Sequence, residues 1–391
     1  MLSSPLRPGS PDMPETRKLY LSAVRSIVIK LGTQLLTDKT GRLDHPFLQN
    51  IAAQVTALRN RNIQVTIVSS GAIGAGLAEL NLPARPKDLA LLQAVAAVGQ
   101  RRLMDAWAAA FAAHSIPVGQ ILLTREDMDR RARFLNLRNT IHALQQLGGV
   151  AIINENDTIS TDEIVKISFG DNDILAALVA HVLRADLLVL MSVVDGLLDS
   201  TGQPVRLVES IEQAQQLVRK EKSQLGKGGM DSKLQAARMV TEAGEAMIVA
   251  DGRMENILPR LLDHEELGTL FIPSHKKRPS RSRWIGSARP VGSLTIDDGA
   301  VKALVEKNKS LLPAGITKVN GPFDKGDLIS IQTTTGEEIA RGLSNYPAHT
   351  IEKIQGQKTP QVRALLGEAA YDEVIHRDNL VITATASTSN Q

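Results

Sequence analysis

Short apolar runs alternate with longer amphipathic segments from Ser26 to about Phe271. The runs "SIVIKLG", "IQVTIVSSGAIGAG", "VAIINEND" and "DLLVLMS" are short, apolar and rich in β-branched residues or leucine, which is typical of strands that are covered on both faces. Segments such as "FLQNIAAQVTALRNRN" carry apolar residues at helical spacing. The pattern predicts an α/β fold: a mostly parallel sheet between two layers of helices, which is a three-layer α/β/α sandwich.

The pattern changes after Phe271. The segment "HKKRPSRSRW" is polar and basic, and the runs beyond it are short, β-like and separated by turn signals such as Gly321-Pro322. They predict a small, barrel-like β-rich domain. The first residues are rich in Pro and Ser without an apolar core, which favours a disordered leader over a signal peptide. The predicted divisions are a leader at 1–22, the sandwich at 23–273, a linker at 274–290, the β-rich domain at 291–372 and a tail at 373–391.

Composition narrows the class of protein. Hydrophobic residues make up 43% of the 391 residues, the net charge is +3, and cysteine is absent. The absence of cysteine excludes disulfides and thiolate metal sites and suits a reducing cytoplasm. The small net charge and the 3% of aromatic residues do not favour a nucleic-acid partner. No apolar run reaches the ~20 residues of a transmembrane helix, so no membrane partner is expected.

Chemically active residues gather in turns that follow the predicted strands. They are "KLGTQLL", "SSGAIGAG", "NEND", "GDND" and, before a helix, "LGKGGMDSKL". In parallel sheets, ligands bind beyond the carboxyl ends of the strands. Glycine-rich anion cradles, two lysines and clustered carboxylates together favour phosphoryl transfer, which needs positive charge and alignment more than covalent help. The P-loop template itself fails, because Lys233 follows Ser232 rather than a glycine.

Each turn also has a purely structural interpretation. A lysine at a strand end is usually solvated. "SSGAIGAG" is equally compatible with a tight turn that packs a helix closely, and "NEND" and "GDND" with capping and turn residues. It is their joint placement along one sheet edge that favours a site.

In this order, the segments "VIKLGT", "VSSGAIGAG", "LLTREDM", "INENDT", "FGDND" and "GKGGMDSKLQAA" resemble the signatures of the amino acid kinase family, in particular its glutamate 5-kinases. The last segment of the chain resembles a PUA domain, an RNA-associated module. The resemblance implies that ATP, with Mg²⁺, phosphorylates the γ-carboxylate of L-glutamate to L-glutamyl 5-phosphate, the first step of proline biosynthesis. It also implies feedback inhibition by proline, a dimer or tetramer, and transfer of the product to glutamate-5-semialdehyde dehydrogenase.

The resemblance also assigns site residues. Lys30 and Lys233 would be catalytic and Asp173 would hold them by ion pairing. The glutamate side would comprise Ser70, Gly71, Asp157, Asp171 and Asn172. The nucleotide side would comprise Lys30, Gly32, Ser192, Val193, Lys227, Gly228, Gly229, Met230, Asp231, Ser232 and Lys233. No side chain is assigned as a dedicated metal ligand.

Two positions depart from the family pattern. Lys227 stands where members usually have threonine, and Val193 stands where they usually have aspartate. Asp195 is the nearby carboxylate that could take the place of the missing one. Two other functions stay open: a sibling kinase that acts on another carboxylate or carbamate, and an RNA-binding protein that acts through the PUA domain.

Overall fold

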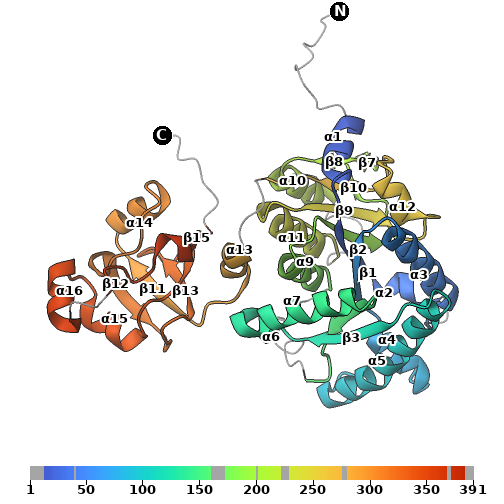
Figure 1. Cartoon of the computed structure of the whole chain (residues 1–391), viewed down its shortest axis with the longest axis horizontal. Coiled ribbons are helices and arrows are strands. Elements are labelled where there is room, and N and C mark those ends of the chain that lie inside the picture. The colour runs from blue at the N-terminus through green and yellow to red at the C-terminus, as the bar shows by residue number, and fades with distance from the viewer. Residues whose placement is uncertain are drawn as a thin grey trace, which may run out of the picture. The chain divides into compact units, whose positions relative to one another are not determined.

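The computed structural model describes residues 13–38, 41–159, 172–199, 201–221, 229–274, 280–367 and 371–383. Contacts divide the chain into two compact units (Figure 1). The first lies within 1–127 and 132–277, and the second within 128–131 and 278–391. Each unit has a hydrophobic core of its own.

An eight-stranded sheet forms the centre of the first unit. Its strand order is β3-β4-β2-β1-β5-β9-β10-β8, and every neighbouring pair is parallel except β9 with β10. The predicted, mostly parallel sheet is therefore confirmed. The strands are β1 (Ser26–Leu31), β2 (Gln64–Ser69), β3 (Val118–Leu123), β4 (Val150–Glu155), β5 (Leu187–Ser192), β8 (Leu207–Val208), β9 (Ala246–Asp251) and β10 (Thr269–Phe271). A separate hairpin joins β6 (Leu197–Leu198) to β7 (Pro204–Val205).

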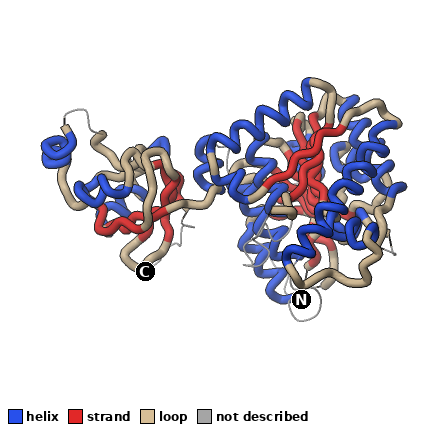
Figure 2. Tube along the Cα trace, turned by 90° about the horizontal axis from the view of Figure 1, so that it is seen from below, coloured by secondary structure: helices blue, strands red, loops and turns tan. Residues whose placement is uncertain are grey.

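Helices cover both faces of this sheet, as Figure 2 shows. Along one face, α3 (His45–Asn60) packs against α5 (Leu89–Ala112) and α12 (Ile257–Leu262); along the other, α9 (Asn172–Leu183) packs against α11 (Gly229–Glu242). The three-layer sandwich is confirmed. Further helices are α1 (Met13–Leu21), α2 (Thr33–Leu36), α4 (Ala72–Glu79), α6 (Arg125–Asp129), α7 (Arg131–Gln146) and α10 (Ile211–Glu221). None of the helices within the described ranges has the length and apolar character needed to cross a bilayer.

The alternation of side chains along β1 decides which face each residue serves. Ile27, Ile29 and Leu31 belong to the core shared with α3, α5 and α12. Successive side chains of a strand point to opposite faces, so Lys30 points to the face that α9 covers. The charge of Lys30 is therefore directed at the N-terminal turn of that helix.

The second unit is built on a five-stranded sheet of order β12-β11-β13-β14-β15. The pair β11–β13 is parallel and the other pairs are antiparallel. The strands are β11 (Gly292–Ile296), β12 (Ile316–Asn320), β13 (Leu328–Gln332), β14 (Glu338–Leu343) and β15 (Leu380–Ile382). The helices are α13 (Ser280–Ser287), α14 (Asp298–Val305), α15 (Ala348–Ile354) and α16 (Thr359–Leu366), with 3₁₀ turns at Pro313–Gly315 and Arg377–Asn379.

The range predicted as a disordered leader contains a described helix, and the range predicted as a tail contains a described strand. Residues 13–21 form α1, because the buried Arg17 donates hydrogen bonds to the carbonyl oxygens of Glu265, Leu267 and Gly268. Residues 380–382 form β15, which pairs with β14. Both elements are held by partners distant in sequence, which the composition of these segments does not reveal.

Candidate functional site

Two ammonium groups meet on one carboxylate at the carboxyl edge of the first sheet. The Nζ of Lys30, at the end of β1, lies 2.7 Å from Oδ1 of Asp173. The Nζ of Lys233, in α11, lies 3.0 Å from Oδ2 of the same carboxylate. Asp173 is fully buried, and Lys30 and Lys233 are 3% and 8% exposed. These three predicted site residues come from distant segments of the sequence, and the fold brings them together.

The electrostatics of this cluster favour an anion. Asp173 stands in the first turn of α9, where the helix dipole stabilises a carboxylate. Ser232 Oγ donates a further hydrogen bond to Asp173 Oδ2 at 3.0 Å. Lysine ammonium groups are common partners of phosphate oxygens. The cluster is therefore suited to binding a group with several negative charges, such as a phosphate.

A second polar group lies beyond β2 and β4. Asn172, next to Asp173, donates through Nδ2 to the carbonyl oxygen of Ser69 and to Ser70 Oγ, both at 2.8 Å. The same Nδ2 lies 3.0 Å from Oδ1 of Asn154, at the end of β4. Residues from β2, β4 and α9 thus share one hydrogen-bonded network directly beside the lysines.

Gly71 stands at the start of α4, beside this network. It precedes α4 with φ +98° and without a side-chain cap for the helix. That left-handed conformation favours glycine, and the first N–H groups of an uncapped helix attract anions. Gly76 has a different role, because a Cβ there would overlap the carbonyl of Val95 in α5. The structure thus supports the packing interpretation of "SSGAIGAG" through Gly76, and anion binding at Gly71 stays a prediction.

The remaining predicted residues fall into three groups. Gly32 follows β1, and a Cβ there would lie 3.8 Å from Lys30 Nζ, so it borders the lysine cluster. Asp157 lies in the turn after β4, and Ser192 ends β5. Gly229, Met230, Asp231 and Ser232 form the first turn of α11. Asp171, Lys227 and Gly228 lie outside the described residues.

The carboxylate of Asp195, the nearby substitute suggested for the one missing at Val193, has two partners within the protein. Its Oδ2 lies 2.8 Å from Arg206 Nη1, and its Oδ1 accepts a hydrogen bond from the backbone N–H of Gly268 at 2.9 Å. Both oxygens are thus engaged in holding the β10 region. Val193 itself is 40% exposed, so an apolar side chain stands at the end of β5.

Sequence reasoning missed two residues of the polar network. Asn154 belongs to the motif "NEND", but only Asp157 of that motif was predicted to bind glutamate. Gln100, in the middle of α5, belongs to no motif, yet its Oε1 accepts a hydrogen bond from Asn154 Nδ2 at 2.8 Å. The sequence offered one signal for Gln100: it is a polar residue among the apolar residues that form the buried face of α5.

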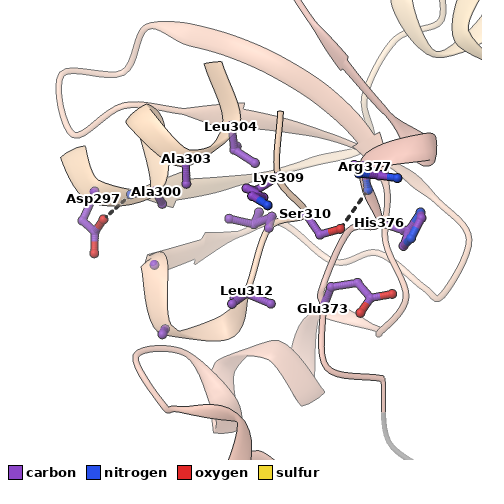
Figure 3. A pocket seen from close by; sticks show the side chains of 14 residues that line it. Asp297, Ala300, Ala303, Leu304, Lys309, Ser310, Leu312, Glu373, His376 and Arg377 are labelled. Carbon is purple, nitrogen blue, oxygen red and sulfur yellow. Dashed lines mark hydrogen bonds between the residues drawn. The ribbon is translucent and has the colours of Figure 1, made fainter. Parts of the chain in front are cut away.

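The second unit contains a cavity of about 700 Å³. Figure 3 shows it between α14, the segment around Ser310 and the segment before β15. Its charged lining includes Lys309, His376 and Arg377 but also Asp297 and Glu373, and Leu304 and Leu312 contribute apolar surface. Ser310 Oγ accepts a hydrogen bond from the backbone N–H of Arg377 at 3.0 Å.

Comparison with known proteins agrees with this geometry. The model of the amino acid kinase family matches residues 25–251, and that of the PUA domain matches residues 292–366. A glutamate 5-kinase of Dehalococcoides mccartyi (strain CBDB1) is 42% identical over 366 residues, covering 92% of this chain and 98% of the relative. One of Geobacter sp. (strain M21) is 41% identical over 374 residues, covering 94% and 100%. The chain therefore belongs to the amino acid kinase family, among its glutamate 5-kinases, and carries a C-terminal PUA domain.

Proposed function

We propose that the chain transfers the γ-phosphoryl group of ATP to the γ-carboxylate of L-glutamate, giving L-glutamyl 5-phosphate for proline biosynthesis. One observation carries the mechanism: the ammonium groups of Lys30 and Lys233 meet on the carboxylate of Asp173. The curated relatives named glutamate 5-kinase, similar over nearly their full length, support the substrate.

The two lysines would stabilise the charge of the moving phosphoryl group from two sides. A γ-carboxylate oxygen forms a bond to the γ-phosphorus while the bond from that phosphorus to the β,γ-bridging oxygen breaks, and ADP leaves. The attacking carboxylate is already ionised, so no general base is required. Asp173 would hold both ammonium groups in place throughout, and fixed charges of this kind lower the barrier without reorganising. The first turn of α11 would contact the nucleotide phosphates.

Mg²⁺ would bind at this site together with the nucleotide. Within the described ranges, no cluster of three or more His, Asp or Glu side chains could hold a metal ion. Mg²⁺ prefers phosphate oxygens and retained water, and it would supply further charge neutralisation at the phosphates. Glutamate would bind on the other side of the lysines, at Ser70, Gly71, Asn172 and Asp157, with Asp171 near them.

The activity test is a hydroxylamine trap of the acyl phosphate. With ATP, Mg²⁺ and glutamate, we expect γ-glutamyl hydroxamate to accumulate. A panel of aspartate, N-acetylglutamate and carbamate separates the sibling kinases, which would prefer one of those acceptors. Folded protein that gives no hydroxamate from glutamate would contradict the proposal.

Regulation and assembly are part of the same proposal. We expect inhibition by proline, a homodimer or homotetramer, a cytoplasmic location, and transfer of the labile product to glutamate-5-semialdehyde dehydrogenase. The same assay with and without proline tests the inhibition, and sedimentation tests the assembly. An RNA-binding role is the second candidate, favoured by the PUA match and the basic side chains at the second-unit cavity. Salt-dependent retention of RNA on a filter, without nucleotide turnover, would reverse the ranking.

A further inference from the structure

The hydrogen-bond network beyond β4 has a fixed direction. Asn154 Oδ1 lies 2.9 Å from the backbone N–H of Glu155, and a backbone N–H can only donate. The other end of the Asn154 amide must therefore be Nδ2, which donates to Gln100 Oε1. At the other end of the network, the carbonyl of Ser69 can only accept a hydrogen bond, so its partner on Asn172 must be Nδ2. The backbone groups of Glu155 and Ser69 therefore fix the orientation of both asparagine amides.

This direction decides what Asn172 offers a ligand. Its Nδ2 carries two N–H donors and already faces three protein acceptors, on Ser69, Ser70 and Asn154. The group left for a substrate is the carbonyl oxygen Oδ1, which accepts only. Ser70 Oγ accepts from Asn172, so its own O–H is left to donate. The network thus presents an acceptor and a donor side by side.

An amino acid has complementary ends, an ammonium that donates and a carboxylate that accepts. We propose that Asn172 Oδ1 binds the α-ammonium of the substrate, and that Gln100 is a positioning residue that holds Asn172 in this orientation through Asn154. This inference rests on the proposed glutamate kinase activity. It adds the residue that enforces selection for an α-amino group, and that residue lies in α5, outside every motif of the sequence.

Burial explains why Gln100 matters. Asn154 is 2% and Gln100 is 7% exposed, so the Nδ2 of Asn154 depends on Gln100 Oε1 for a partner. A buried donor without its acceptor costs roughly 1–3 kcal/mol, and Asn154 would rotate to avoid that cost. Rotation of the Asn154 side chain would move its Oδ1 away from Asn172 Nδ2, so Asn172 would lose one of the partners that fix its orientation.

A second feature shows that the orientation of Gln100 is imposed by this network. Its Nε2 is buried and has no hydrogen-bond partner within the described part of the chain. Flipping the Gln100 amide would set Nε2 against Nδ2 of Asn154, donor against donor. Gln100 therefore leaves both N–H groups of Nε2 without a partner in the described part of the chain while its Oε1 gives Asn154 an acceptor.

The test is Gln100→Met, which keeps the length of the side chain and removes the acceptor. Glutarate lacks only the α-ammonium of glutamate, so the ratio of kcat/KM for glutamate to that for glutarate measures selection for this group. We expect the ratio to fall about tenfold, mainly through a higher KM for glutamate, while the KM for ATP changes less than twofold. Gln100→Glu retains an oxygen acceptor, and burial favours its neutral form, so it should keep the ratio within about twofold of wild type.

Gln54→Met is the matched control. Gln54 is 4% exposed and hydrogen-bonded to the backbone N–H of Leu258 and to Asn50, but it lies in α3, outside the network. It should lower the melting temperature without changing the ratio. An unchanged ratio in Gln100→Met, or an equal fall in the Gln54 variant, would overturn the inference. Absence of glutamate turnover in the wild-type protein would instead overturn the proposed function.

Discussion

At the scale of single residues, the contacts among Lys30, Asp173 and Lys233 indicate how much a substitution in this cluster should raise the activation barrier. Asp173 is fully buried between two ammonium groups, 2.7 and 3.0 Å away. Such groups act as fixed charges on a phosphoryl group, and loss of one transition-state donor of this kind costs ~3–4 kcal/mol of barrier. The lysines are therefore expected to affect turnover far more than substrate binding.

We predict that Lys233→Ala lowers kcat by ~100-fold or more, because a single transition-state charge is removed. Steady-state kinetics with the hydroxamate assay measures this, and circular dichroism checks that the fold is intact. Lys87→Ala, at an exposed lysine before α5, is the control and should leave kcat unchanged. A tenfold or smaller loss in a folded Lys233 variant would count against its role.

At the scale of elements, the contact between α4 and α5 positions the start of α4 at the glutamate side. A Cβ at Gly99 in α5 would overlap the carbonyl oxygen of Ala72 in α4. Ala72 follows Gly71, whose left-handed conformation begins the helix. Close packing of the two helices therefore fixes the backbone that is proposed to face a carboxylate of the substrate.

We predict that Gly99→Ala lowers the free energy of unfolding by about 1–3 kcal/mol, the usual cost of overpacking, and raises the KM for glutamate by displacing α4. Denaturant titration and steady-state kinetics measure the two effects. Gly74→Ala is the control, because its Cβ would only touch Thr37 Cγ2 at 3.9 Å. That variant should be as stable as wild type or more stable, since alanine is the better helix former. Equal behaviour of the two variants would show that the helix contact does not matter.

At the scale of the whole molecule, each unit has its own core, while the proposed nucleotide and glutamate sites lie in the first unit. A ligand stabilises only the part of a protein that binds it in the native state. Units with separate cores are expected to respond separately to heat.

We predict two thermal transitions by calorimetry, of which only one responds to a non-hydrolysable ATP analogue with Mg²⁺ and glutamate. At ligand concentrations of about 100 times Kd, the gain is ~2.7 kcal/mol, which raises the melting temperature of a unit of this size by roughly 5–10 °C. A single transition would show that the units unfold as one, and equal shifts of two transitions would show that the ligands stabilise both units.

Much of the fold could be predicted from the sequence. The apolar strand runs and the glycine and acidic turns are local signals, and they placed Lys30, Ser70, Asn172 and Lys233 on one sheet edge before any geometry was known. The leader and tail could not be predicted, because Arg17 and β15 are held by distant backbone groups. Gln100 was missed for the same reason, since its partner Asn154 lies in another element.

The sequence by itself determined the alternation of strands and helices, the order of the binding turns and, through the joint motifs, the family. Periodicity and turn chemistry act between near neighbours, so a single chain displays them fully. Only the tertiary structure decided how closely the two lysines approach Asp173, that Asp195 contacts Arg206 and Gly268, and that Gln100 of α5 contacts Asn154 beside the site. These outcomes depend on which side chains meet across the sheet and on the direction of each hydrogen bond, and packing alone settles both.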